Sequence, residues 1–139
     1  MIKKDRRPKV TIRGVYYGTN RTLPSLNDYL AEIGKNPKAG GKMKSDFEKV
    51  CVSSIRRCLK GWKVTKPPVQ LTYRFFENKK GKGRDLGNIE GFCKKVFEDA
   101  LQATGVIEND NMKWIDSYIT EGYVIDDEPY IEIEFLEKG

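Results

Sequence analysis

The sequence contains no histidine, so imidazole is available neither as a general base nor as a metal ligand. Carboxylates, lysines and metal-bound water remain as possible catalytic groups. The chain also has only three cysteines in 139 residues. Cys51 and Cys58 fall seven apart on one predicted helix and Cys93 on another, a spacing without a zinc signature. We expect these thiols to pack in the core as small hydrophobes rather than to form disulfides or bind metal.

Long apolar runs are missing as well. No stretch is long enough to span a bilayer, and no signal-peptide core follows the opening segment from Met1 to Arg7. The protein is therefore expected to be cytosolic, with no membrane partner. A chain of this length predicts one domain over residues 1–139 with a single core.

Charge is distributed unevenly along the chain, which carries a net +6. Residues 1–63 hold sixteen Lys and Arg against five acids, whereas residues 106–139 hold two against ten. A basic region in a small domain is typical of a protein that binds a phosphate backbone. The alternative is that these side chains only solubilise helices, and the acids described below favour nucleic acid.

Periodicity predicts the elements of the first half. Val10, Ile12 and Tyr16 indicate a strand interrupted by Gly14, and Ser25 opens a short helix through a capping box. Residues 36–41 are expected to be a non-helical break between this helix and a longer one over residues 43–60. The polar side of that helix carries a basic stripe, which is either a solvated face or a track for phosphates: Lys42, Lys49, Arg56 and Lys60.

Residue patterns also predict the elements of the second half. Residues 69–76 predict a strand, and the Lys- and Gly-rich residues 77–83 predict a flexible loop that contacts DNA through Lys79, Lys80 and Lys82. A helix with an apolar face ends at Gly105, two strands follow Asp110, and residues 126–129 predict a solvated hairpin turn. The order β-α-α-β-α-β-β predicts an α/β (α+β) domain, with helices packed on a mixed, largely antiparallel sheet.

Acids occur on both sides of that third helix. Asp85 lies just before it, Lys95 and Asp99 are four residues apart on it, and Asp110 follows the turn that ends it. Oxygen ligands from separated parts of a chain suit a hard cation such as Mg²⁺, which activates water and neutralises charge in phosphodiester cleavage. A Lys and an Asp four apart are, taken alone, most often a surface ion pair.

The motif order around this helix resembles that of the RusA-type Holliday-junction resolvases. It consists of Arg-Asp-x-x-Asn at 84–88, Lys95, Asp-Ala-Leu at 99–101, Gly-Val at 105–106 and Asn-Asp-Asn at 109–111. Residues 22–49 also resemble the N-terminal half of Gram-positive phage and prophage members. The resemblance implies a homodimeric endonuclease that cuts opposed strands of four-way DNA junctions with Mg²⁺, for which Mn²⁺ can substitute, and that uses no small-molecule cofactor.

Residue by residue, the resemblance assigns catalysis and metal binding to Asp85 and Asp110, and a catalytic or scissile-phosphate role to Lys95. Arg84 and Asn88 are expected to contact DNA. Gly87 stands where the family has a second metal-binding Asp, and Asn109 where many members have another.

The segment from Asp85 to Asp99 is also about one helical turn longer than in the shortest family version. Either Glu90 or Asp99 is a candidate for the missing ligand, or the site binds metal poorly. Two other functions stay open: junction binding with weakened catalysis, and an RNA- or ribosome-binding module that would rest on basicity and on Tyr16, Tyr17 and Trp62.

Overall fold

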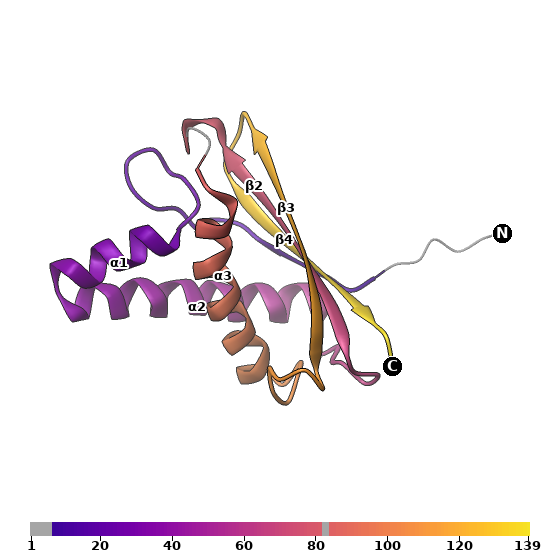
Figure 1. The fold of residues 1–139 in the computed structure, drawn as a ribbon. Helices are drawn as coiled ribbons and strands as arrows, with labels where there is room; N and C mark the ends of the chain where they lie inside the picture. Colours follow the sequence, from indigo (N-terminus) through magenta and orange to yellow (C-terminus); the bar gives the residue numbers. More distant parts are fainter. Residues whose placement is uncertain (1–6, 82–83) are drawn as a thin grey trace.

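The computed structural model describes residues 7–81 and 84–139 (Figure 1). Three helices and four strands follow one another in the predicted order, with one added turn of 3₁₀ helix. Within the described ranges, no helix is long and apolar enough to cross a membrane. The elements are β1 (Lys9–Ile12), α1 (Leu26–Lys35), α2 (Pro37–Leu59), β2 (Val69–Asn78), η1 (Lys79–Gly81), α3 (Leu86–Ala103), β3 (Ile115–Ile125) and β4 (Tyr130–Glu137).

The strands form one mixed sheet in the order β1-β4-β2-β3. β4 pairs antiparallel with both β1 and β2, whereas β2 and β3 are parallel and are joined through α3. Parallel neighbours need such a crossover connection. Because β2 lies between β3 and β4, residues 126–129 pass over the end of β2, and the prediction of a hairpin turn there is wrong.

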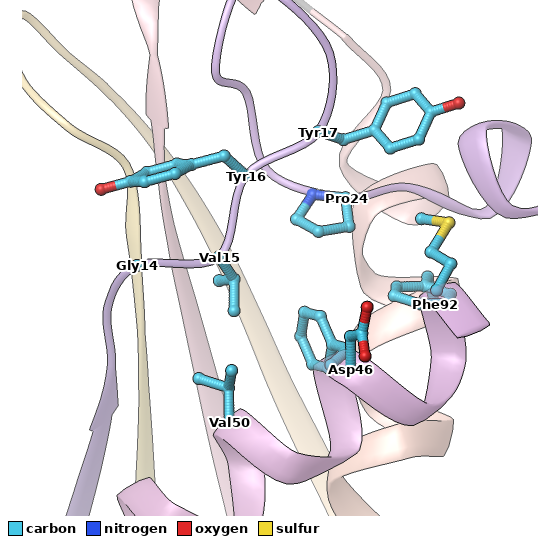
Figure 2. A pocket seen from close by; sticks show the side chains of 10 residues that line it. Gly14, Val15, Tyr16, Tyr17, Pro24, Asp46, Val50 and Phe92 are labelled. Carbon is cyan, nitrogen blue, oxygen red and sulfur yellow. The ribbon is translucent and has the colours of Figure 1, made fainter.

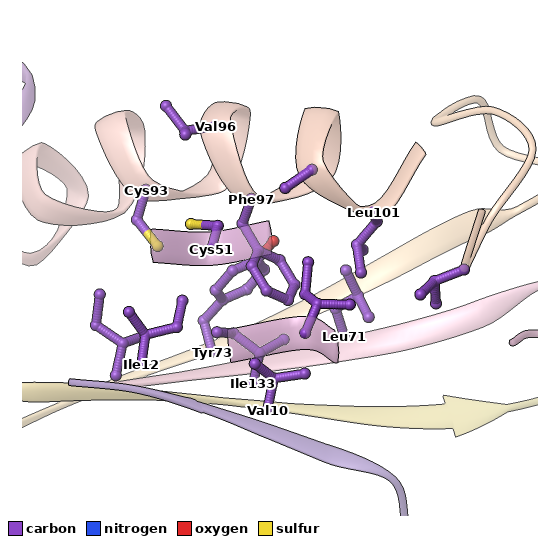
Figure 3. Packing of buried hydrophobic residues seen from close by; sticks show 14 of the residues in the cluster. Val10, Ile12, Cys51, Leu71, Tyr73, Cys93, Val96, Phe97, Leu101 and Ile133 are labelled. Carbon is purple, nitrogen blue, oxygen red and sulfur yellow. The ribbon is translucent and has the colours of Figure 1, made fainter. Parts of the chain in front are cut away.

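The core lies between the sheet and the helices α2 and α3, which pack on it (Figure 3). Inward-facing residues of β2 and β4 alternate with outward-facing polar ones, as the sequence predicted. Cys51 and Cys93 are buried in this core, which confirms their packing role, and burial raises the pKa of both thiols. The third thiol, Cys58, is partly buried and packs against the same core.

The predicted break over residues 36–41 is wrong, because α2 begins at Pro37 and runs through both glycines. Asn36 alone separates α1 from α2, and its side chain accepts a hydrogen bond of 2.8 Å from the backbone N–H of Ala39. Proline at the first helical position has no N–H to leave unpaired, so Asn-Pro starts a helix here. Gly40 is needed for the close contact between helices, since a Cβ there would lie 2.5 Å from Ile33 Cγ1.

Two other elements have different ends from those predicted. β1 ends at Ile12, so Tyr16 lies outside the strand, in the segment that leads to α1. The loop expected from residue 77 is partly wrong, because Glu77 and Asn78 extend β2 and residues 79–81 form η1. Glu77 is buried and accepts a hydrogen bond from the backbone N–H of Leu23, which explains why a polar residue ends a strand inside the fold. The capping box at Ser25 and the end of α3 before Gly105 are confirmed.

Candidate functional site

One side of α3 carries a carboxylate that the sequence analysis did not single out. Glu98 is only 7% exposed, and both of its oxygens accept hydrogen bonds from tyrosine hydroxyls. Tyr118 of β3 donates at 2.8 Å to Oε1, and the fully buried Tyr73 of β2 donates at 3.1 Å to Oε2. These bonds fix the carboxylate at the junction of α3 with the parallel strands.

A lysine lies next to this carboxylate on the same side of α3. Lys94 Nζ is 3.3 Å from the centre of the Tyr118 ring and 3.4 Å from Oε1 of Glu90. Glu90, Lys94 and Glu98 are spaced by four residues, so they line one edge of the helix. With Tyr73, Tyr118 and the nearby Asp110 they make up what we call the Glu98 cluster.

The negative charge of Asp110 also acts on this cluster. Burial raises the pKa of Glu98, while the hydrogen bonds from Tyr118 and Tyr73 and the charge of Lys94 lower it, and the negative charge of Asp110 raises it further. The net effect is a pKa above the ordinary value for glutamate. Burial and the hydrogen bond to Glu98 likewise raise the pKa of Tyr118, with added contributions from Asp110 and Glu90. Asp110 therefore acts electrostatically on the two residues at the centre of the cluster.

Asp85 lies at the opposite end of α3, as the N-terminal cap of the helix. Its Oδ1 accepts a hydrogen bond of 3.0 Å from the backbone N–H of Gly87, and its side chain is exposed. Asp85 and Glu98 are 13 residues apart, which corresponds to about 20 Å along the helix axis. The single chain thus brings Asp110 close to Glu98 but does not bring it together with Asp85, although the resemblance assigned both acids to one site.

Lys95 and Asp99 form an ion pair of 3.3 Å on a different side of α3. The Lys95 side chain is 65% exposed, so this pair is open to solvent. Lys94, the neighbour of Lys95 in sequence, is the lysine that lies beside Glu98.

The described residues contain no group of three or more His, Cys, Asp or Glu side chains arranged to hold a metal ion. The four predicted ligands, Asp85, Glu90, Asp99 and Asp110, are accordingly not gathered into one cage. Mg²⁺ is commonly held by only one or two carboxylates, with water and substrate phosphate completing its shell. Asp110 and Glu98 supply oxygen donors of that kind, and the charge of Asp110 acts on Glu98.

Two residues predicted to contact DNA also have structural contacts within the chain. The Arg84 guanidinium pairs with Asp28 of α1 at 3.1 Å and with Glu77 of β2, and it also donates to the backbone carbonyl of Leu23. Asn88 Oδ1 accepts a hydrogen bond of 2.9 Å from the backbone N–H of Asn27. Both side chains therefore anchor the start of α1 against α3 and β2.

The other predicted DNA contacts are distributed over two surfaces. Lys42, Lys49, Arg56 and Lys60 are all exposed on α2, and Lys49 and Arg56 border a shallow hollow around Ser53. Lys42 pairs with Asp46 at 2.7 Å. On η1, Lys79 pairs with Asp126 at 3.0 Å and Lys80 is exposed, while Lys82 lies outside the described residues.

No protein-family model and no curated protein matches this chain. The Glu98 cluster therefore rests on the contacts described above and, for Asp110, on the effect of its charge. Part of this cluster could have been predicted from the sequence, because Glu90, Lys94 and Glu98 are spaced by four residues beside the apolar face of the helix. Nothing local indicated that Tyr73 and Tyr118 would meet them, because those contacts depend on the parallel pairing of β2 and β3.

Proposed function

We propose that this protein is a Mg²⁺-dependent, structure-selective endodeoxyribonuclease that cuts four-way DNA junctions as a homodimer. The observation that carries the proposal is the buried Glu98 carboxylate, which is held by two tyrosine hydroxyls and is acted on by the charges of Lys94 and Asp110. It lies within the segment whose motif order resembles that of junction resolvases. Two carboxylates of like charge held near each other, with a lysine beside them, are an arrangement suited to a cation and a phosphate.

The residues of the cluster have separable roles in this proposal. Asp110 and Glu98 would hold the ion, which when bound supplies an activated water and neutralises negative charge. Lys94 neutralises the scissile phosphate from the adjacent helix turn. Tyr73 and Tyr118 keep the Glu98 carboxylate in place through their hydroxyl groups, so they are positioning residues.

The surface charges favour DNA approaching over α2. The outward face of the sheet carries Glu121, Glu132 and Glu134, which pair with Arg74 and other basic side chains. By contrast, the exposed side of α2 carries the basic stripe from Lys42 to Lys60. A phosphate backbone is attracted to the second surface and repelled from acids on the first.

A homodimer suits the proposed substrate because the two strands to be cut are related by a two-fold axis. Paired cuts at symmetric positions then need one active site from each subunit. Sedimentation of the purified protein at micromolar concentration is expected to give a dimer. A monomer that still makes paired cuts would contradict this part of the proposal.

The experiment compares a synthetic four-way junction with a linear duplex of the same arm sequence. We expect Mg²⁺-dependent cutting of the junction only, and its loss on chelation and on Lys94→Ala. Lys113→Ala, which removes an exposed lysine before β3, serves as the matched control and is expected to cut normally. Equal cutting of junction and duplex would overturn the selectivity in the proposal, and no cutting of either would overturn the enzymatic assignment.

A second candidate is a junction-binding protein of the same fold with weakened or lost catalysis. Two observations favour it: Gly87 lacks the carboxylate that the resemblance calls for, and the described residues hold no ready group of three metal-type side chains. Junction binding without cutting at any Mg²⁺ or Mn²⁺ concentration would select this alternative.

A further inference from the structure

A surface pocket of about 190 Å³ lies between the segment that precedes α1 and the side of α2, away from the Glu98 cluster (Figure 2). Its floor is apolar and is made by Pro24, Met43, Phe47, Val50 and Phe92. Phe92 comes from α3, where it contacts the ring of Phe47 edge-on at 5.1 Å. A pocket of this size admits one small ring system and is below the usual range for drug-sized ligands, about 300–1,000 Å³.

Two aromatic side chains on the loop border this pocket, and both are held in place. The Arg21 guanidinium lies 4.1 Å from the centre of the Tyr16 ring, and Tyr17 donates a hydrogen bond of 2.8 Å to Glu32 of α1. The two rings leave the loop on opposite sides, with Pro24 between them (Figure 2). Ordered rings lose little entropy on binding, so they suit contacts with a flat ligand.

One carboxylate lines the pocket. Asp46 on α2 is exposed, and the hydrogen bond from Lys42 together with the charges of Lys42 and Lys49 lowers its pKa. Asp46 is therefore an anionic group that only accepts hydrogen bonds. Lys42, which pairs with Asp46, and Lys49 flank it on the helix, and both cations attract phosphates on either side of a bound ring.

We propose that this pocket binds one unpaired DNA base that carries an exocyclic amino group, with Asp46 accepting from that amino group and Lys42 and Lys49 contacting the neighbouring phosphates. Adenine and cytosine have such a donor, whereas thymine has none. The proposal rests on the proposed function, because a junction that opens at its branch point would present an unpaired base to this chain. The cationic rim around an acceptor favours a nucleotide over an apolar side chain of another protein.

The test measures binding of the full-length protein to short single strands that differ only at one central position. That position is adenine, cytosine, thymine or an abasic residue, and fluorescence anisotropy reports the dissociation constant. We expect adenine and cytosine to bind about tenfold more tightly than thymine, and thymine more tightly than the abasic strand. Equal affinity for all four strands would overturn the proposal.

Replacement of Asp46 separates base recognition from simple charge attraction. If the surface only attracts phosphates, Asp46→Ala removes a repelling charge and tightens binding of every strand equally. If Asp46 accepts from the base, the same variant loses the tenfold preference for adenine and cytosine. Glu48→Ala removes the same charge two residues along α2, outside the pocket, and is expected to keep the preference.

Filling the pocket provides an independent variant. Val50→Phe places a ring on the floor and is expected to reduce the affinity for all base-containing strands to that of the abasic strand, whereas Ser53→Phe adds the same ring outside the pocket and is expected to bind normally. If circular dichroism shows that Val50→Phe does not fold, the binding of Asp46→Ala still decides between base recognition and charge attraction. Normal junction cutting without base discrimination overturns this inference alone, while absence of both DNA binding and cutting overturns the proposed function as well.

Discussion

The Tyr118 hydroxyl donates a hydrogen bond of 2.8 Å to Oε1 of Glu98, which ties the edge strand β3 to a buried carboxylate of α3. Tyr73 donates to the other oxygen from the neighbouring strand. The two tyrosines differ in exposure, since Tyr73 is fully buried and Tyr118 is 37% exposed. They therefore offer a matched comparison of the same chemical change in two environments.

Tyr73→Phe is expected to destabilise the fold more than Tyr118→Phe. Loss of the buried hydroxyl leaves one Glu98 oxygen without its donor, at a cost of about 1–3 kcal/mol. Water can replace the Tyr118 hydroxyl at the surface, so the second change is expected to cost under about 1 kcal/mol. Chemical denaturation of both variants measures the difference, and an equal loss would mean that water already reaches Glu98 from the Tyr73 side.

Arg84→Lys is expected to lower the free energy of unfolding by about 2 kcal/mol, because a lysine ammonium lacks the planar fork of separated nitrogens with which the guanidinium reaches Asp28, Glu77 and the Leu23 carbonyl together. The exposed Lys95→Ala is the control and is expected to change stability by no more than about 0.5 kcal/mol. Thermal melts report both. If Arg84→Lys melts like the wild type but binds junctions poorly, Arg84 contacts DNA after all.

Gly40→Ala and Gly41→Ala are expected to change stability in opposite directions. A Cβ at position 40 would press on Ile33, whereas position 41 has open space around it. Inside a helix, alanine is favoured over glycine by about 1 kcal/mol, so Gly41→Ala should stabilise the protein by up to that amount. Gly40→Ala should destabilise it, and denaturation curves of the two variants measure the contrast. Equal stabilisation would mean that α1 does not pack on α2 at Gly40.

Gly87→Asp is expected to leave the Mg²⁺ concentration needed for half-maximal cutting unchanged, because position 87 lies beside Asp85, at the opposite end of α3 from Glu98. A lower Mg²⁺ requirement in this variant would place the ion at Asp85 instead. A Cβ at position 87 would lie 3.6 Å from Asp85 Oδ1, so a second carboxylate fits beside the first without a clash. Gly87→Asn has the same size without the charge and is the control. Glu90→Gln is expected to leave the Mg²⁺ requirement unchanged, because Glu90 pairs with Lys94. A higher Mg²⁺ requirement in Glu90→Gln would instead make Glu90 the replacement ligand.

Local patterns in the sequence predicted most elements but not their boundaries. The apolar residues of α3, β2 and β4 recur with the period of one buried face each, so these elements could be predicted directly from the sequence. Glycine at positions 40 and 41 suggested a break, but the cap at Asn36 and the packing of Gly40 on Ile33 outweighed that preference. Glycine inside a helix costs about 1 kcal/mol, which a helix contact can offset.

Long-range relationships were harder to predict. The place of Arg84 and Asn88 in a motif predicted DNA contacts, which stay a prediction, but it did not indicate that both residues anchor α1. The Glu98 cluster depends on the parallel pairing of β2 with β3, which sets Tyr118 opposite Leu71 and turns its hydroxyl toward α3. Strand alternation in the sequence specifies which residues share a face, but it leaves the choice of neighbouring strand open.

The most direct test of the central claim is the rate of four-way junction cutting by Asp110→Asn, compared with Asp116→Asn under the same Mg²⁺ concentration. Asp116 is an exposed acid that pairs with Lys138 at 2.8 Å, so its replacement controls for a lost surface charge. We expect Asp110→Asn to bind the junction but to cut it at least about a hundredfold more slowly, while Asp116→Asn cuts at the wild-type rate. Cutting by Asp110→Asn at the wild-type rate would contradict the central claim.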